Sequence, residues 1–400
     1  MSTPTIAPAS AAEASAAIVI FSLALGGFAI GTTEFASMAL LPYFAPELGV
    51  SEAQAAQAIS AYALGVVIGA PLLAVLGARL PRRRFLVWLM LAFAVFNTAS
   101  GLAHNFGTML VFRFLSGLPH GAYFGVGALM AASVVSPKKR TQAVAMLMVG
   151  LTVATTLGVP LANFLGQTIG WRWGFALVGV LSLITAAAVH IFAPRGTGTA
   201  GGNALSQLSA LKNRQVLLTL ATAAIGFGGF FAVYTYFTLT AMEVTHVPEA
   251  VVPGLLMIFG LGMTVGTILL GWAADRNQTL SIYGIMGANV LALLCYPMAT
   301  GAGWSMALVG FCIGMTSSTG TAIQARLMDV AGDAQELAAA LNHSAFNTAN
   351  AIGPAVAAAA LTLGWGLPAT GYVGALLTAI GIVLFTITVL DARRNGTGPT

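Results

Sequence analysis

The sequence predicts an all-α integral membrane protein whose twelve spans form two pseudo-symmetric six-helix bundles. Of its 400 residues, 58% are hydrophobic and only 7% are charged, and the mean hydropathy is +0.89. Soluble domains carry roughly 25% charged residues. Apolar runs recur along the whole chain, each long enough to cross a hydrocarbon core of about 30 Å as a helix. Matching motifs in the two halves of the sequence predict that the two bundles are related by pseudo-symmetry.

The apolar runs fall into two groups of six. The first run is too long for the hydrophobic core of a signal peptide, and no basic residue precedes it, so we expect it to be a retained span. The twelve predicted spans cover residues 16–42, 53–76, 85–103, 107–135, 142–166, 172–193, 216–241, 251–274, 281–299, 305–328, 337–362 and 371–390.

The positive net charge of +5 has a topological explanation. If the N-terminus is cytoplasmic, the basic residues gather in the cytoplasmic connections, and only Arg113 and Arg172 lie elsewhere. This asymmetry follows the positive-inside rule, so both termini are predicted to be cytoplasmic and no nucleic-acid partner is implied. The cytoplasmic set comprises Arg79, Arg82, Arg83, Arg84, Lys138, Lys139, Arg140, Arg195, Lys212, Arg214, Arg276, Arg326, Arg393 and Arg394.

A polar connection near the middle of the chain separates the two groups of spans. Residues 194–215 are rich in Gly, Thr, Ser and Asn, which is typical of a flexible linker. We therefore predict an N-terminal six-helix bundle over residues 1–193, a cytoplasmic linker over 194–215, and a C-terminal six-helix bundle over 216–400.

The two halves carry similar motifs at equivalent positions. Residues 26–28 (GGF) and 33–35 (TEF) in span one match residues 228–230 (GGF) and 235–237 (TYF) in span seven, at the same spacing. Further matches join Gly77–Arg82 to Gly271–Arg276 after spans two and eight, and Gly158-Val-Pro160 to Gly353-Pro354 in spans five and eleven. Three matches in the same order favour a duplication.

This design resembles the major facilitator superfamily, in which substrate binds near the midplane between two halves that rock around it. Gly271–Arg276, which includes Asp275, resembles the family's cytoplasmic G-x-x-x-D-R motif, and Arg113–Gly117 resembles its R-x-x-x-G motif. Gly158 and Pro160, followed by Gly166, resemble the glycine–proline signature of drug:proton antiporters. Residues 33–35, 170–172 and 346–350 are most similar to the branch of sugar, arabinose, purine and chloramphenicol exporters.

The gating motifs allow two interpretations. The first cytoplasmic motif has Pro81 where the family usually has the aspartate of the closed gate, which leaves Arg82 to Arg84 to act alone or simply to anchor the topology. Gly158 and Pro160 can bend span five and seal the inner pathway, as the antiporter resemblance implies, or can merely allow close helix packing.

No signature of an enzyme or an ATP-driven pump is present. The sequence contains no Gly-Lys-Ser/Thr phosphate loop and no H-E-x-x-H or G-x-S-x-G motif. Its two cysteines, Cys295 and Cys312, sit in apolar runs without metal-ligand spacing, so we expect no metal and no cofactor. Energy must then come from an ion gradient or from the gradient of the substrate itself.

Two charges, Glu34 and Arg113, lie deep in predicted spans. Ionisable groups in hydrocarbon are costly and mark functional sites by default. Counted from the outer ends of their spans at 1.5 Å per residue, both lie roughly 10–12 Å below the outer surface. A carboxyl whose surroundings change between two states can bind a proton in one and release it in the other. Proton coupling by Glu34 and Arg113 is favoured over a static pair, and His120, on the same face as Arg113, fits a proton relay or helix packing equally well.

Aromatic and amide side chains supply a candidate substrate cavity. Apolar pockets with a few polar anchors suit small organic ligands, although aromatics in membrane helices more often pack or face lipid. The candidate liners are Phe35, Tyr62, Tyr123, Tyr234, Tyr236, His343 and Asn347.

The resemblance implies a monomeric, proton-coupled antiporter that exports drugs, sugars or nucleoside-like metabolites across a bacterial inner membrane. An importer or uniporter of the same fold, or a membrane sensor that moves no solute, remains as an alternative.

Overall fold

The computed structural model describes residues 9–77, 80–136, 139–195, 212–331 and 335–395, and all regular structure in these ranges is helical. Most of the predicted linker and the basic residues Arg79 and Lys138 lie outside them. The N-terminal half contains α1 (Ala9–Ala39), α2 (Leu41–Glu47), α3 (Glu52–Ala55), α4 (Gln57–Gly77), α5 (Arg82–Gly101), α6 (Phe106–Ser133), α7 (Arg140–Val153), the π-helical turn η2 (Ala154–Gly158), α8 (Val159–Thr168) and α9 (Arg172–Phe192).

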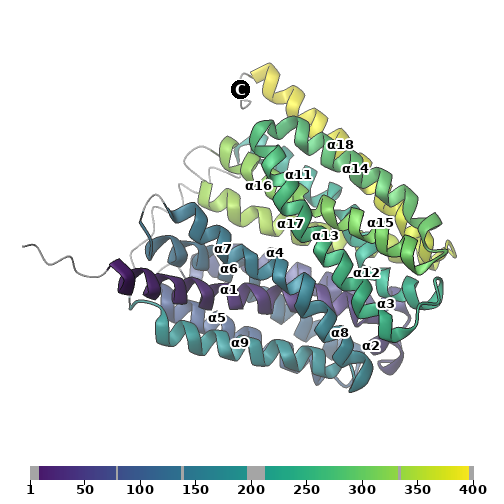
Figure 1. Ribbon diagram of the computed structural model, residues 1–400, viewed down its shortest axis with the longest axis horizontal. Coiled ribbons are helices and arrows are strands. Elements are labelled where there is room, and N and C mark those ends of the chain that lie inside the picture. The colour runs from purple at the N-terminus through teal and green to yellow at the C-terminus, as the bar shows by residue number, and fades with distance from the viewer. Residues whose placement is uncertain (1–8, 78–79, 137–138, 196–211, 332–334, 396–400) are drawn as a thin grey trace, which may run out of the picture.

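The C-terminal half repeats this order of long helices. It contains α11 (Arg214–Gly226), α12 (Gly228–Glu243), the 3-10 turn η4 (Glu249–Val251), α13 (Val252–Arg276), α14 (Gln278–Ala299), α15 (Gly303–Met315), the 3-10 turn η5 (Thr316–Ser318), α16 (Thr319–Val330), α17 (Gln335–Thr362), the 3-10 turn η7 (Leu367–Ala369) and α18 (Thr370–Asn395). In Figure 1 the N-terminal helices, purple to teal, fill the lower part of the view, and the C-terminal helices, green to yellow, fill the upper part.

Ten helical segments in the described ranges are long and apolar enough to cross a membrane. The two predicted spans that do not meet this test are α6 and α17, although each has 28 residues. Their mean hydropathy is reduced by the polar residues that the sequence analysis singled out, among them Arg113 and His120 in α6 and His343 and Asn347 in α17. Length and hydropathy thus identify ten candidate spans in the described residues, and the count of twelve stays a prediction.

Glycines allow the helices of each half to approach closely, and they do so at matching places. A Cβ atom at Gly117 on α6 would overlap the backbone carbonyl of Tyr62 on α4, and one at Gly314 on α15 would overlap that of Phe259 on α13. The two contacts are equivalent, since they join spans two and four in one half and spans eight and ten in the other. Small residues at such crossings let backbones pack directly in a membrane, where lipid removes the hydrophobic drive between helices.

The close packing at Gly117 leads to a prediction for stability. Gly117→Ala forces α4 and α6 apart, and we expect it to lower the free energy of unfolding by about 1–3 kcal/mol. Gly125→Ala on the same helix is the control, because Gly125 is exposed and a Cβ there would meet nothing within 4 Å. Thermal unfolding of the purified variants compares the two. Equal midpoints would contradict the packing argument.

Span five is not a continuous α-helix. The π-helical turn η2 separates α7 from α8, and Pro160 lies in the first turn of α8. Proline lacks the N–H group that would continue the α-helical hydrogen-bond pattern, so a break at this place is expected. A Cβ at Gly158 would overlap the hydroxyl of Thr32 on α1, so Gly158 also permits close packing. Both interpretations of this motif, a bend and a close approach, therefore have a local basis.

The connection between α8 and α9 is tied to the end of α2. Gly170 has a backbone φ of +105°, a conformation that favours glycine, and Trp171 and Arg172 follow it. The side chains of Trp171 and Arg172 both donate hydrogen bonds to the carboxylate of Glu47. Partial burial acts to raise the pKa of Glu47, but these hydrogen bonds outweigh it and hold the pKa below its usual range. The motif thus has a structural role at this end of the N-terminal half.

The two halves are joined at the end of the bundle away from the chain termini. There, Gln167 of α8 donates a hydrogen bond of 2.7 Å to the carbonyl oxygen of Glu249, and the Tyr43 hydroxyl lies 3.6 Å from the sulfur of Met242. Ser60 of α4 donates a hydrogen bond of 3.2 Å to the carbonyl oxygen of Ala351 in α17. Figure 1 shows α2, α3, α8 and α12 gathered at this end, on the right of the view, while α1 starts on the left.

Candidate functional site between the two halves

Glu34 lies at the contact between the two halves. Its side chain, on α1, is only 6% exposed. Asn350 on α17 donates its amide Nδ2 to Oε1 of Glu34 at 3.5 Å, so the acid of one half contacts a polar residue of the other. The next residue, Phe35, also crosses the interface, because its ring stacks on Phe231 at 6.1 Å and meets the edge of Tyr234 at 5.3 Å. A buried acid that contacts both halves can respond to their relative movement.

Arg113 reaches α1 on either side of Glu34 rather than the carboxylate itself. Its two terminal nitrogens donate to the hydroxyls of Thr33 at 3.1 Å and Ser37 at 3.2 Å. Among the described residues, no ion pair within 4.0 Å joins it to Glu34. The guanidinium carbon lies 4.2 Å above the ring of Tyr62, a cation–π contact that holds the charge in place. The two deep charges are therefore neighbours but not a direct pair.

A chain of hydrogen bonds fixes the position of Arg113. The Thr33 hydroxyl accepts a hydrogen bond from Arg113 and donates one of 2.6 Å to Oδ1 of Asn97 on α5. Asn97 in turn donates to the carbonyl oxygen of Phe93 at 2.8 Å. Sequence reasoning noted Thr33 only as part of a motif and missed Ser37 and Asn97, because short hydroxyl and amide residues in a span indicate ordinary helix packing as readily as a site.

Removing the arginine is expected to destabilise the protein. Arg113→Ala empties a buried volume above Tyr62 and leaves the hydroxyls of Thr33 and Ser37 without their donor, so we expect a loss of about 3 kcal/mol in the free energy of unfolding. Arg394→Ala, at an exposed position near the end of α18, is the matched control. The midpoint of thermal unfolding in detergent measures both. An Arg113→Ala midpoint equal to that of the control would contradict this account.

His120 and His343 meet across the interface. The Tyr62 hydroxyl and Nδ1 of His120 share a hydrogen bond of 2.9 Å, so Tyr62 contacts Arg113 with its ring and His120 with its hydroxyl. The rings of His120 and His343 are 6.2 Å apart, and His343 stacks on Phe124 at 5.0 Å with an interplanar angle of 4°. The predicted residues thus form one continuous series, from Arg113 on α6 to Tyr62 on α4, back to His120 on α6 and across to His343 on α17.

The remaining predicted cavity residues divide into two groups. Tyr234 and Asn347 are buried, and the Tyr234 hydroxyl and Oδ1 of Asn347 have no hydrogen-bond partner among the described residues. Tyr123 and Tyr236 instead join helices within one half. The Tyr123 hydroxyl donates to the carbonyl oxygen of Leu23 at 2.8 Å, and that of Tyr236 donates to Pro354 at 3.4 Å. These hydrogen bonds give both tyrosines a packing contact, and their place in the substrate cavity stays a prediction.

Buried polar atoms without partners gather on α12 and α17. Native proteins leave few such atoms, so a group of them marks a place where water or a ligand is needed. Within the described part of the chain, the group comprises Tyr234, Thr235 and Thr238 on α12 and Asn342, Ser344, Asn347 and Asn350 on α17. Two of them lie where the halves meet, since Asn350 contacts Glu34 and Tyr234 contacts Phe35.

The predicted gating residues lie at helix ends or at close helix crossings. Gly77 ends α4, Arg82 begins α5 and Arg276 ends α13, while Gly271 and Asp275 lie within the last two turns of α13. In α17, Gly353 is packed so closely on α12 that a Cβ would overlap the carbonyl of Gly228, and Pro354 follows it. Their places agree with motifs at the ends and crossings of spans, whereas a gating role stays a prediction.

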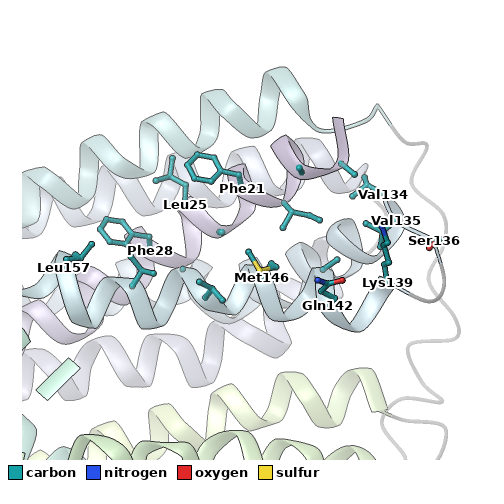
Figure 2. Close-up of a pocket in the computed structure, with 18 residues that line it drawn as sticks. Phe21, Leu25, Phe28, Val134, Val135, Ser136, Lys139, Gln142, Met146 and Leu157 are labelled. Carbon is teal, nitrogen blue, oxygen red and sulfur yellow. The ribbon is translucent and has the colours of Figure 1, made fainter. Parts of the chain in front are cut away.

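A separate apolar groove of about 1080 Å³ runs between α1 and α7. Figure 2 shows Phe21, Leu25 and Phe28 on α1 facing Met146 of α7 along this groove, with polar side chains only at one end. Phe21 is largely exposed, so the groove is open at the surface of the N-terminal half. Its lining includes none of the predicted site residues.

Long apolar helices in two halves, with buried polar and charged residues between them, are the features of a membrane transporter built from two helical bundles. The sequence matches the model of the Major Facilitator Superfamily over residues 23–335, and the chain belongs to this family. It is a transporter and not an enzyme.

Relatives and solved structures agree with this assignment. The chain is 37% identical to the inner membrane transport protein YdhP of Escherichia coli O157:H7, over 94% of this chain and 96% of the relative. It is 31% identical to a chloramphenicol resistance protein of Streptomyces lividans, over 91% of this chain and 94% of that one. The crystal structure of a D-xylose-proton symporter has the same fold, with a TM-score of 0.70, 15% identity and coverage of 92% of this chain and 96% of that one. The predicted family and exporter branch are thus confirmed.

Proposed function

We propose that this protein is a proton-coupled antiporter that exports small organic molecules by alternating access. The observation that carries the proposal is the position of Glu34. It is a buried acid on one half, it contacts Asn350 of the other half, and it lies one residue from the aromatic contact made by Phe35. A proton bound there in one state of the interface and released in the other would couple the movement of the halves to the proton gradient.

The direction of transport rests on resemblance. The names of several relatives refer to resistance or efflux, among them the chloramphenicol resistance protein of Streptomyces lividans and a sugar efflux transporter of Mannheimia succiniciproducens. The D-xylose-proton symporter has the same fold, so an importer is the alternative. The aromatic and amide residues at the interface suit neutral ligands such as amphenicols, sugars and purines.

The sign of a pH change separates these possibilities. Purified protein is placed in liposomes that contain a pH dye, with the membrane potential clamped, and chloramphenicol, arabinose or a purine is added outside. Inward movement of substrate by an antiporter drives protons out, so the interior becomes alkaline whichever way the protein is inserted. Acidification would instead indicate symport, and labelled substrate that enters without a pH change would indicate a uniporter. Protein-free liposomes control for passive leakage.

A further inference from the structure

A second, smaller cavity lies in the C-terminal half, far from Glu34 along the spans. It has a volume of about 400 Å³ and is formed where α14 begins and where α16 and α18 end. Its lining includes Asn277, Thr279, Tyr283, Arg326, Val389 and Arg393. The sequence analysis used Arg326 and Arg393 only as indicators of topology, and the proposed transport mechanism uses neither.

Arg326 is the unusual residue of this cavity. Its side chain is 1% exposed, and its guanidinium carbon lies 5.3 Å from the centre of the Phe385 ring. Its Nε atom is buried and has no hydrogen-bond partner among the described residues. A buried cation with an unused donor is costly unless an anion is supplied. The cavity that Arg326 lines is the place from which such an anion would come.

The cavity lining is positive in the described residues. It contains two arginines, Arg326 and Arg393, and no acid. Two acids lie outside the lining. Asp391 forms an ion pair of 3.0 Å with Arg214. Asp329, whose charge also acts on Arg326, accepts a hydrogen bond of 2.9 Å from Gln278.

The start of α14 adds to this charge. Asn277 caps the helix by accepting from the backbone N–H of Leu280, and Thr279 and Leu280 in its first turn line the cavity. The N-terminus of a 22-residue helix carries a partial positive charge and unpaired N–H groups, which favour anions.

We propose that this cavity binds a phosphate group, held by Arg326 and Arg393 at the start of α14. The planar guanidinium of arginine can donate two parallel hydrogen bonds to two oxygens of one phosphate group. The lipid headgroup is the favoured source, because the cavity lies at the ends of membrane-spanning helices and its rim includes Leu280, which is 68% exposed and can contact an acyl chain.

Native mass spectrometry of the full, delipidated chain tests this site. Short-chain phosphatidylglycerol is titrated into wild type, Arg393→Gln and the control Arg394→Gln, whose arginine is exposed and does not line the cavity. We expect the apparent affinity to fall about fivefold in Arg393→Gln and to stay unchanged in the control. Equal losses in both variants, or none in either, would overturn the proposal, because general attraction to basic residues would then explain binding.

Inorganic phosphate separates the two sources of the ligand. If phosphate alone raises the midpoint of thermal unfolding in wild type but not in Arg393→Gln, the occupant is the free anion. If only phosphatidylglycerol does so, the occupant is the lipid. Arg326→Lys, which keeps the charge but loses the planar group, should weaken whichever ligand binds while retaining the fold. If neither phosphate nor phosphatidylglycerol raises the midpoint of thermal unfolding, the site is refuted.

Discussion

Glu34→Gln is expected to abolish substrate-driven proton movement and to reduce it to the level of protein-free liposomes. Glutamine is nearly the same shape as glutamate and still offers an oxygen to Asn350, so the interface should persist. It cannot bind and release a proton, so the coupling step is lost. Exchange of labelled for unlabelled substrate, which needs no net proton movement, should continue in the variant.

The matched control is Glu249→Gln. Glu249 is an exposed acid in η4, at the end of the bundle where the halves are joined, and only its backbone oxygen takes part in the contact with Gln167. Its replacement should leave both proton movement and exchange intact. A Glu34→Gln protein that still concentrates substrate at the expense of a proton gradient would show that the coupling acid lies elsewhere. Loss of exchange together with proton movement would indicate a structural role for Glu34.

The sequence predicted that Glu34 and Arg113 lie at the same depth along their spans, but it did not predict which residues they contact. Counting residues from the ends of spans places Glu34 and Arg113 at one depth, because the rise per residue of a helix is fixed. It does not fix which way each side chain turns, and Arg113 in fact bonds to Thr33 and Ser37. These hydroxyls of α1 accept from the two terminal nitrogens without any ion pair, whereas the buried Nε of Arg113 has no hydrogen-bond partner among the described residues.

The contacts between the halves could not be predicted from the sequence, for a different physical reason. Helical periodicity describes one helix at a time, whereas the contact between Glu34 and Asn350 depends on how two separate bundles dock. Motif resemblance selected residues 346–350 but gave them no partner. The tyrosines show the same limit, since Tyr234 crosses to Phe35 while Tyr236, two residues later, turns toward Pro354 within its own half.

A disulfide between Ser60→Cys and Ala351→Cys is expected to stop transport. The Ser60 hydroxyl donates to the carbonyl oxygen of Ala351 at 3.2 Å, so these residues of α4 and α17 are direct neighbours across the interface. Alternating access requires the halves to separate at this end of the bundle during each cycle. Oxidation should therefore abolish substrate exchange, and a reducing agent should restore it. Cys295 and Cys312, both exposed, are first replaced by serine.

The two single-cysteine variants, oxidised in the same way, separate the cross-link from the substitutions. Each should retain exchange, because neither can join the halves. Substrate binding measured by quenching of tryptophan fluorescence should survive in the cross-linked protein, since the bond holds the conformation in which the halves already touch. If the cross-linked protein exchanged substrate at the full rate, this end would not need to open, and a channel or a pathway confined to one half would replace alternating access as the explanation of the buried polar residues.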